Sequence, residues 1–98
     1  MIVIRDIFQL HFGKAKEATA LLKEGQQILA RDGYSTGHLL VDVTGEFYTL
    51  VMESTFESLA AYESGLGSAV ASKEWQAVYG RFVPLVRSGR REVLRIVE

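Results

Sequence analysis

Residues 2–12 are hydrophobic at most positions and rich in β-branched and aromatic side chains, which predicts a β-strand. Successive side chains of a strand point to opposite sides of the sheet, so the two sides can be considered separately. One side is apolar except for Asp6 and consists of Ile2, Ile4, Asp6, Phe8, Leu10 and Phe12. The other side is mixed and consists of Val3, Arg5, Ile7, Gln9 and His11. A strand with one apolar and one half-apolar face is expected to be covered on both sides.

The pattern becomes helical over residues 14–31, where Ala and Leu recur every three or four positions. Gly25 lies inside this stripe at a cost of about 1 kcal/mol relative to Ala. We expect Gly25 to let the helix backbone pack closely on the sheet. Gly33 follows and can adopt the left-handed conformation that ends many helices.

Residues 38–43 and 47–53 predict two strands of a hairpin around the turn 44–46. Alternation assigns one side of each strand to the core. The expected core positions are Leu39, Val41 and Val43, followed by Tyr48, Leu50 and Met52.

A second helix is expected to begin at Ser54, because Ser54 and Glu57 have the spacing of a capping box. The pair of glycines at Gly65 and Gly67 predicts a break in this helix. Ser72 is then expected to cap a further helical segment with an aromatic stripe.

This stripe consists of Trp75, Val78, Tyr79, Phe82 and Val83. Pro84 lacks a backbone donor and is expected to bend or end the segment. Residues 91–97 predict the last strand.

The predicted order β-α-β-β-α-β gives an antiparallel sheet of order 4-1-3-2 with the helices on one face, because β-α-β crossovers are right-handed. The expected fold class is α+β and ferredoxin-like, in one domain over residues 1–98. The uncovered face keeps an apolar patch that is unusually large for a monomer. It comprises Val3, Ile7, Leu40, Phe47, Val51 and either Val93 and Val97 or Leu94 and Ile96. We therefore expect a homodimer that packs sheet to sheet as a dimeric α/β barrel.

Composition excludes several function classes. The chain has 98 residues, of which 48% are hydrophobic, and a formal net charge of −1, so it lacks the basic surface typical of nucleic-acid or anionic-membrane binding. It has no cysteine, which excludes disulfides and thiolate metal ligands. No apolar run approaches the roughly 20 residues that cross a bilayer. Met1 leads directly into strand pattern without a signal peptide, so a cytoplasmic location is expected.

Asp6 is the main candidate for chemistry, because a carboxylate on a helix-covered strand face must be paired or neutral. One interpretation makes Asp6 a catalytic general base or hydrogen-bond acceptor in a pocket between the sheet and the second helix. The other makes it a satisfied core carboxylate that accepts from Tyr, Trp or a backbone donor. Phe8, Tyr48, Trp75 and Tyr79 are the expected walls of the ligand pocket, with ordinary core packing as the alternative.

The polar side chains expected at the dimer face are Arg5, His11, His38, Glu53 and Arg95. The three charged ones are expected to form an ion network that sets the dimer register. The two histidines lack the spacing of metal ligands. No metal site is predicted, and both are expected to form hydrogen bonds near the interface.

Three further arginines, Arg87, Arg90 and Arg91, are expected at a helix C-terminus, where they would interact favourably with the helix dipole. No P-loop, dinucleotide-binding or G-x-S-x-G hydrolase motif occurs in the chain.

Two segments carry a family resemblance. They are the tail from Trp75 and Tyr79 through Phe82-Val83-Pro84-Leu85-Val86 to Gly89-Arg90-Arg91-Glu92-Val93-Leu94, and the opening of the second helix from Glu57-Ser58-Leu59 to Tyr62. In these residues the chain resembles the NIPSNAP group of the dimeric α/β-barrel superfamily. The resemblance covers nearly the whole chain and implies a ferredoxin-like dimer. It implies little chemistry, because many members of the group have no assigned activity.

The same superfamily includes antibiotic-biosynthesis-type and heme-degrading monooxygenases. By resemblance, the first-strand Asn of the heme-degrading members corresponds to Asp6, and their second-helix Trp to Trp75. Their His has no counterpart, because no histidine follows Trp75. The resemblance therefore gives no support for heme, and no cofactor is predicted.

The sequence leaves three functions open and does not decide whether the protein is an enzyme. The first is a dimer that binds a small hydrophobic or aromatic molecule. The second is a cofactor-independent monooxygenase acting on a phenol or quinol, with Asp6 as the base and Trp75 and Tyr79 as pocket walls. The third is a purely structural or assembly module with a filled core.

Overall fold

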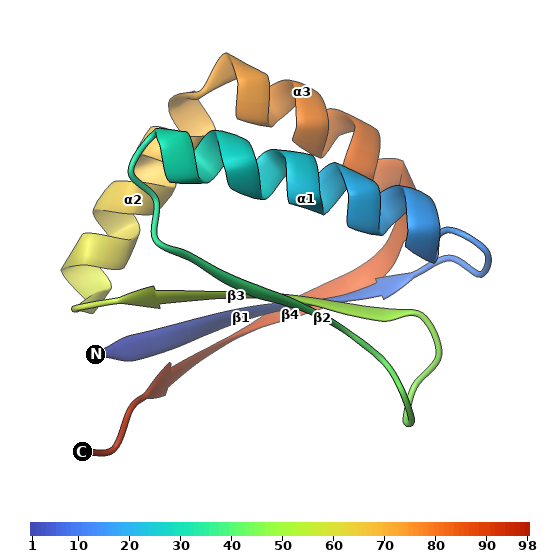
Figure 1. The fold of residues 1–98 in the computed structure, drawn as a ribbon, viewed down its shortest axis with the longest axis horizontal. Helices are drawn as coiled ribbons and strands as arrows, with labels where there is room; N and C mark the ends of the chain where they lie inside the picture. Colours follow the sequence, from blue (N-terminus) through green and yellow to red (C-terminus); the bar gives the residue numbers. More distant parts are fainter.

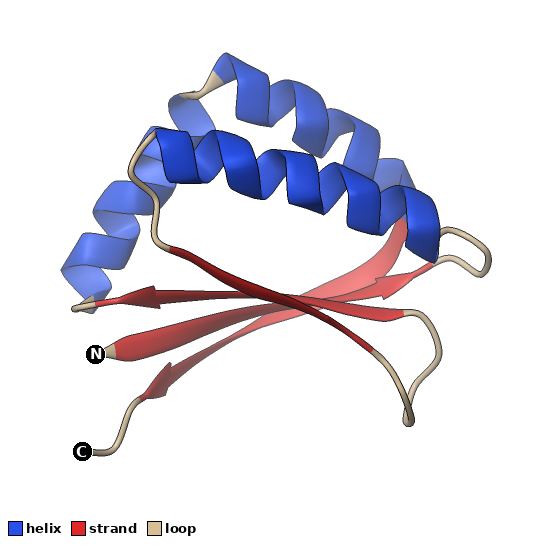
Figure 2. Cartoon of the chain, viewed as in Figure 1, coloured by secondary structure: helices blue, strands red, loops and turns tan.

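The computed structural model describes residues 1–98. The elements are β1 (Ile2–Leu10), α1 (Ala15–Arg31), β2 (Thr36–Val41), β3 (Thr49–Phe56), α2 (Leu59–Ala71), α3 (Lys73–Phe82), a 3-10 turn (Val83–Leu85) and β4 (Val86–Arg95). The strands form one antiparallel sheet of order β2-β3-β1-β4, the predicted order read from the other edge. All three helices lie on one side of the sheet (Figures 1 and 2). The predicted ferredoxin-like α+β fold is therefore confirmed.

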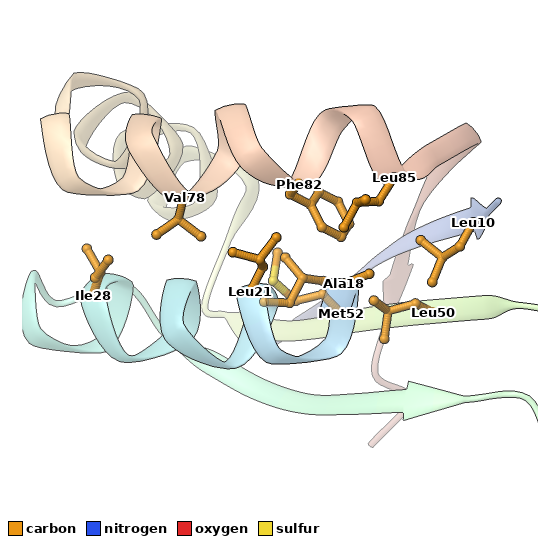
Figure 3. Packing of buried hydrophobic residues seen from close by; sticks show 10 residues of the cluster. Leu10, Ala18, Leu21, Ile28, Leu50, Met52, Val78, Phe82 and Leu85 are labelled. Carbon is orange, nitrogen blue, oxygen red and sulfur yellow. The ribbon is translucent and has the colours of Figure 1, made fainter. Parts of the chain in front are cut away.

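The larger part of the core lies between α1, α3 and the sheet. Leu22 of α1, Phe82 of α3 and Leu50 of β3 are almost fully buried there. Figure 3 shows the side chains of α1 and α3 converging on those of β1 and β3. Each fully buried Leu or Phe contributes about 1.5–3 kcal/mol relative to an exposed one, so this layer is a main source of stability.

A second, smaller cluster of buried residues lies toward the start of β1. It consists of Ile2, Ile4, Leu29, Tyr34, Phe56, Tyr62 and Ala69. Trp75 of α3 packs against both clusters. The core therefore has two parts that meet at this indole.

Gly25 permits a close approach, but its main partner differs from the one expected. A Cβ atom on Gly25 would lie 2.5 Å from Cζ3 of Trp75, which is a severe overlap. The glycine therefore makes room for an aromatic ring of α3, where close packing on the sheet was expected. Gly33 has φ +88° immediately after α1, as the sequence predicted.

The second helix begins later than predicted. Ser54 lies within β3, because β3 pairs with β1 along its whole length and places Phe56 opposite Ile2. Ser58 is the cap, and its hydroxyl accepts from the backbone N–H of Ala61 at 3.1 Å. The capping box predicted at Ser54 is therefore wrong.

Helix α2 also runs through both glycines, where a break was predicted. A Cβ on Gly65 would lie 3.1 Å from the ring of Phe56, so this glycine serves close packing of α2 on β3. The break falls at Ser72, whose hydroxyl accepts from the N–H of Trp75 at 3.3 Å. Pro84 follows the end of α3 in the 3-10 turn, as predicted.

The hairpin is shifted relative to its prediction. Tyr48 has φ 57° and precedes β3, and the long turn before it takes Val43 away from the sheet. Val41 and Val43 are 56% and 94% exposed, so assigning them to the core was wrong. Phe47 also lies in this turn, against the ring of Phe12 at 6.0 Å.

Strand register decides which β4 residues belong to the uncovered face. Val3 lies opposite Leu94, whereas Ile4 lies opposite Val93. Leu94 therefore joins Val3 and Ile7 on the uncovered face, and Val93 belongs to the helix-covered side. No helix of the structure is both long enough and apolar enough to cross a bilayer.

Candidate ligand-binding cavity

A cavity of about 740 Å³ lies beside Asp6 on the helix-covered side of the sheet. Its lining comes from every helix and from β1, β3 and β4. The lining residues are Asp6, Phe8, Leu22, Leu29, Tyr34, Met52, Leu66, Ala69, Val70, Trp75, Gln76, Tyr79, Val86, Ser88, Gly89, Arg90 and Arg91. Most are apolar, which is typical of a site for a small organic ligand.

Most of the side chains expected around the pocket do line it. Asp6, Phe8, Trp75 and Tyr79 all lie on the cavity wall. The rings of Trp75 and Tyr79 are 5.8 Å apart, one helical turn from each other on α3. Tyr48 does not line this cavity, because its left-handed backbone places its ring 4.8 Å from that of Phe12.

Asp6 forms an ion pair with Arg91 of the neighbouring strand. The two residues are opposite each other in the β1–β4 register, and Arg91 Nε lies 2.5 Å from Asp6 Oδ1. The carboxylate side chain is 9% exposed and the arginine side chain 47% exposed. Asp6 therefore accepts from a guanidinium, and not from the Tyr, Trp or backbone donors considered from the sequence.

Arg91 is the site residue that the sequence analysis missed. The sequence predicts Arg91 at a helix C-terminus with Arg87 and Arg90, but β4 begins at Val86 and contains all three. The alternation of Gly89, Arg91 and Val93 was the available signal, since it places Arg91 on the helix-covered face. The other two arginines pair with carboxylates at the surface, Arg87 with Glu46 and Arg90 with Glu92.

Two buried tyrosines surround the ion pair. The guanidinium carbon of Arg91 lies 5.7 Å from the ring centre of Tyr62, a cation–π distance. The Tyr62 hydroxyl is buried and has no hydrogen-bond partner. Burial raises the pKa of Tyr62, and burial likewise raises the pKa of Tyr34, partly offset by a hydrogen bond with Ser54.

The surroundings of Arg91 stabilise its charged form. Burial by itself lowers the pKa of Arg91, but the hydrogen bond and the negative charge of Asp6 outweigh that effect and raise it overall. The cavity therefore contains a permanently positive guanidinium held by a carboxylate.

The residues expected on the uncovered face are only partly brought together. Arg5 Nε lies 2.6 Å from Glu53 Oε2, so this part of the ion network is present. Arg95 lies opposite Ile2 and belongs to the helix-covered side, so placing it in the network was wrong.

The two histidines are separate surface residues. His11 follows the end of β1, and its backbone N–H donates to Leu85 O at 2.9 Å. His38 is exposed on β2. The structure contains no group of three or more His, Cys, Asp or Glu side chains that could hold a metal ion.

Comparison with known proteins identifies a family and a fold. The model of the NIPSNAP family matches residues 5–98. An uncharacterised NIPSNAP domain protein from Burkholderia xenovorans superposes with a TM-score of 0.89 at 15% identity, covering 99% of this chain and 95% of that one. A NIPSNAP family protein from Agrobacterium tumefaciens has a TM-score of 0.91 at 23% identity, covering 99% and 86%.

A more distant likeness extends to another group. A putative antibiotic biosynthesis monooxygenase from Nitrosomonas europaea has a TM-score of 0.77 at 6% identity, with complete coverage of both chains. This likeness concerns the fold alone. No curated protein matches the chain in sequence.

Proposed function

We propose that the chain, which belongs to the NIPSNAP family, is a small-molecule-binding protein whose site is the cavity beside Asp6. The observation that carries this proposal is the cavity itself. Its volume of about 740 Å³ lies within the usual range for ligand sites. Its walls are mainly aromatic and aliphatic, and the Asp6–Arg91 ion pair lies among them.

The cavity argues against the structural-module alternative. A module with a filled core would have closed the space between Trp75, Tyr79 and the sheet, because protein interiors are close-packed. Here these rings face a large open volume. A small hydrophobic or aromatic ligand is the occupant that this lining favours.

The monooxygenase alternative receives less support. Its proposed base, Asp6, already accepts a short hydrogen bond from Arg91. The likeness to the Nitrosomonas protein, at 6% identity, concerns the fold and supplies no catalytic residue. We therefore favour Asp6 as the residue that holds Arg91 in place.

We further propose that two copies pack through their uncovered sheet faces to form a dimeric α/β barrel. Leu40 and Leu94 are each 43% exposed, and the register places both on this face. The charges of the face balance. Two arginines, Arg5 and Arg90, lie there with two glutamates, Glu53 and Glu92. A face with exposed leucines and no net charge is suited to packing against a second copy of itself.

Trp75 provides a direct test of ligand binding, because it is the single tryptophan of the chain and lines the cavity. Its indole N–H gives one isolated NMR signal. We expect 1-naphthol, a small aromatic probe, to shift this signal in a saturable way. Val70→Phe, which adds bulk to the cavity wall from an exposed position on α2, should weaken the binding severalfold.

Val43→Phe is the matched control, since Val43 lies in the hairpin turn and is 94% exposed. It should bind the probe like the wild type. A shift that does not saturate, or equal affinity in the wild type and Val70→Phe, would contradict binding in the cavity.

A further inference from the structure

We propose that the ligand of this cavity combines an apolar body with one carboxylate, and that the terminal nitrogens of Arg91 bind the carboxylate. The inference rests on the proposed binding function and adds the charge of the ligand. It follows from the geometry of Arg91 and from the contacts that fix its guanidinium before a ligand arrives.

The geometry leaves donors of Arg91 available. A guanidinium has five N–H donors in a planar fork. The pair with Asp6 uses Nε, so Nη1 and Nη2 remain at the far edge of the fork. Arg91 lines the cavity and its side chain is 47% exposed, so a ligand can reach these two nitrogens.

The guanidinium is also fixed before a ligand arrives. Asp6 Oδ1 holds Nε at 2.5 Å, and the ring of Tyr62 packs against the guanidinium with 5.7 Å between Cζ and the ring centre. An arginine restrained in this way loses less side-chain freedom when it binds. Two parallel N–H donors match the two oxygens of a carboxylate.

The charges of the wall are balanced. Among the lining residues whose side chains lie on the helix-covered side, Asp6 is negative and Arg91 is positive. Arg90 borders the cavity, but its side chain belongs to the uncovered face, opposite Ile7, and pairs with Glu92 at the surface. The carboxylate of a ligand would therefore meet Arg91 as its charged donor.

The apolar part of the ligand would lie against the other walls. Trp75 and Tyr79 present aromatic surface from α3, and Leu66 and Val70 present aliphatic surface from α2. The site therefore separates into an apolar region and one cationic group, the arrangement that an amphipathic monocarboxylate would fill.

Three probes with the same body and different charge test this inference: 4-phenylbutyrate, its neutral amide, and 4-phenylbutylamine. Affinities are measured by titration calorimetry and by the Trp75 indole signal. We expect the carboxylate to bind at least about tenfold more tightly than the amide, which corresponds to 1.4 kcal/mol. The amine should bind most weakly.

Arg91→Gln should bring the carboxylate down to the affinity of the amide and leave the amide unchanged. Arg87→Gln is the matched control, since Arg87 lies on the same strand but outside the cavity, and it should preserve the preference. An amide that binds the wild type as tightly as the carboxylate would overturn the inference. So would a preference that survives in Arg91→Gln.

The outcomes also separate the two proposals. If none of the three probes nor 1-naphthol binds, the proposed function fails. If the amide binds well and the carboxylate shows no advantage, the function stands and only the assignment of ligand charge fails. If Arg91→Gln does not fold, the comparison of the three probes on the wild type still tests the charge of the ligand. Arg91→Lys is a second variant that keeps the positive charge but lacks the planar fork of donors. It should lose part of the preference for the carboxylate.

Discussion

Arg91 Nε donates to Asp6 Oδ1 at 2.5 Å, from one strand to its direct register partner on the next. The pair lies on the helix-covered side of the sheet and borders the cavity. One interaction thereby neutralises a nearly buried carboxylate and orients the arginine that faces the cavity. Stability and binding are consequently linked through the same two side chains.

Removing the arginine should destabilise the fold. Arg91→Met leaves Asp6, with its side chain 9% exposed, as an unpartnered carboxylate. We expect a loss of about 2–3 kcal/mol in the free energy of unfolding, slightly below the range for fully buried pairs because half of Arg91 meets water. Urea denaturation measures this loss.

The matched control is Arg87→Met, whose exposed pair with Glu46 spans 3.5 Å; it should change stability by less than about 0.5 kcal/mol. Adding Asp6→Asn to Arg91→Met should restore part of the loss, because the charge is then gone. Equal losses of stability in Arg91→Met and Arg87→Met would show that the Asp6–Arg91 pair contributes no more to stability than an exposed ion pair.

Tyr62→Phe should stabilise the protein at neutral pH. The Tyr62 hydroxyl is buried without a partner, and an unsatisfied buried polar group costs roughly 1–3 kcal/mol. Phenylalanine keeps the ring against Arg91 and removes the hydroxyl. We expect a gain of about 1 kcal/mol in thermal or urea unfolding; a clear loss would indicate that the hydroxyl is satisfied in solution.

Stability should decline at alkaline pH. Burial raises the pKa of Tyr34 and of Tyr62 above the ordinary value of 10.0, so above pH 10.0 the folded state retains protons that the unfolded state has released. The stabilisation that these two tyrosines contribute is complete below pH 10.0 and is lost as the pH rises through their folded-state pKa values.

Urea unfolding between neutral and strongly alkaline pH measures this decline. The double variant Tyr34→Phe/Tyr62→Phe should have a flatter profile than the wild type. Tyr79→Phe, at a more exposed tyrosine, should keep the wild-type slope. A double variant with an unchanged slope would refute the assignment.

Two glycine substitutions should act in opposite directions. Gly25→Ala places a Cβ 2.5 Å from Trp75 Cζ3, and overpacking of this kind typically costs about 1–3 kcal/mol. It should also move the Trp75 fluorescence maximum. Gly67→Ala, within α2 and with no atom within 4 Å of the added Cβ, should gain about 0.5–1 kcal/mol from helix propensity. Equal effects in unfolding experiments would contradict this packing.

The proposed dimer predicts which surface changes separate the subunits. Sedimentation velocity at micromolar concentration should show a dimer for the wild type and a monomer for Leu40→Glu or Leu94→Glu, because each buries a charge in the apolar interface. Val43→Glu, in the hairpin turn, should stay dimeric. A monomeric wild type would remove the proposed interface altogether.

The spacing of hydrophobic residues was sufficient to predict the order of helices and strands, because the two kinds of element have different periods, about 3.6 and 2 residues. The spacing did not predict the boundaries of those elements whose ends are determined by tertiary contacts. Ser54 has the sequence of a helix cap, yet pairing with β1 retains it in β3. Gly65 was predicted to break the helix, but it lies within α2, where the missing side chain leaves room for the ring of Phe56.

For the site, sequence identified the unusual residue but not its partner. Asp6 stood out because it interrupts an apolar face. Arg91 is 85 positions away, and only the register of β4 places the two side chains together. Shifting the start of that strand from residue 91 to Val86 converts Arg91 from a residue at a helix end to a residue of the cavity wall.

The division of the core into two clusters that share Trp75 has a dynamic consequence. Tyr62 and Ala69 of α2 belong to the smaller cluster, while the larger one is built by α1, α3 and the sheet. Cooperative units of this kind can open separately. Amide protons of α2 should therefore exchange with deuterium sooner than those of α1. Local opening of α2 would let a ligand enter the cavity while the remainder of the protein stays folded.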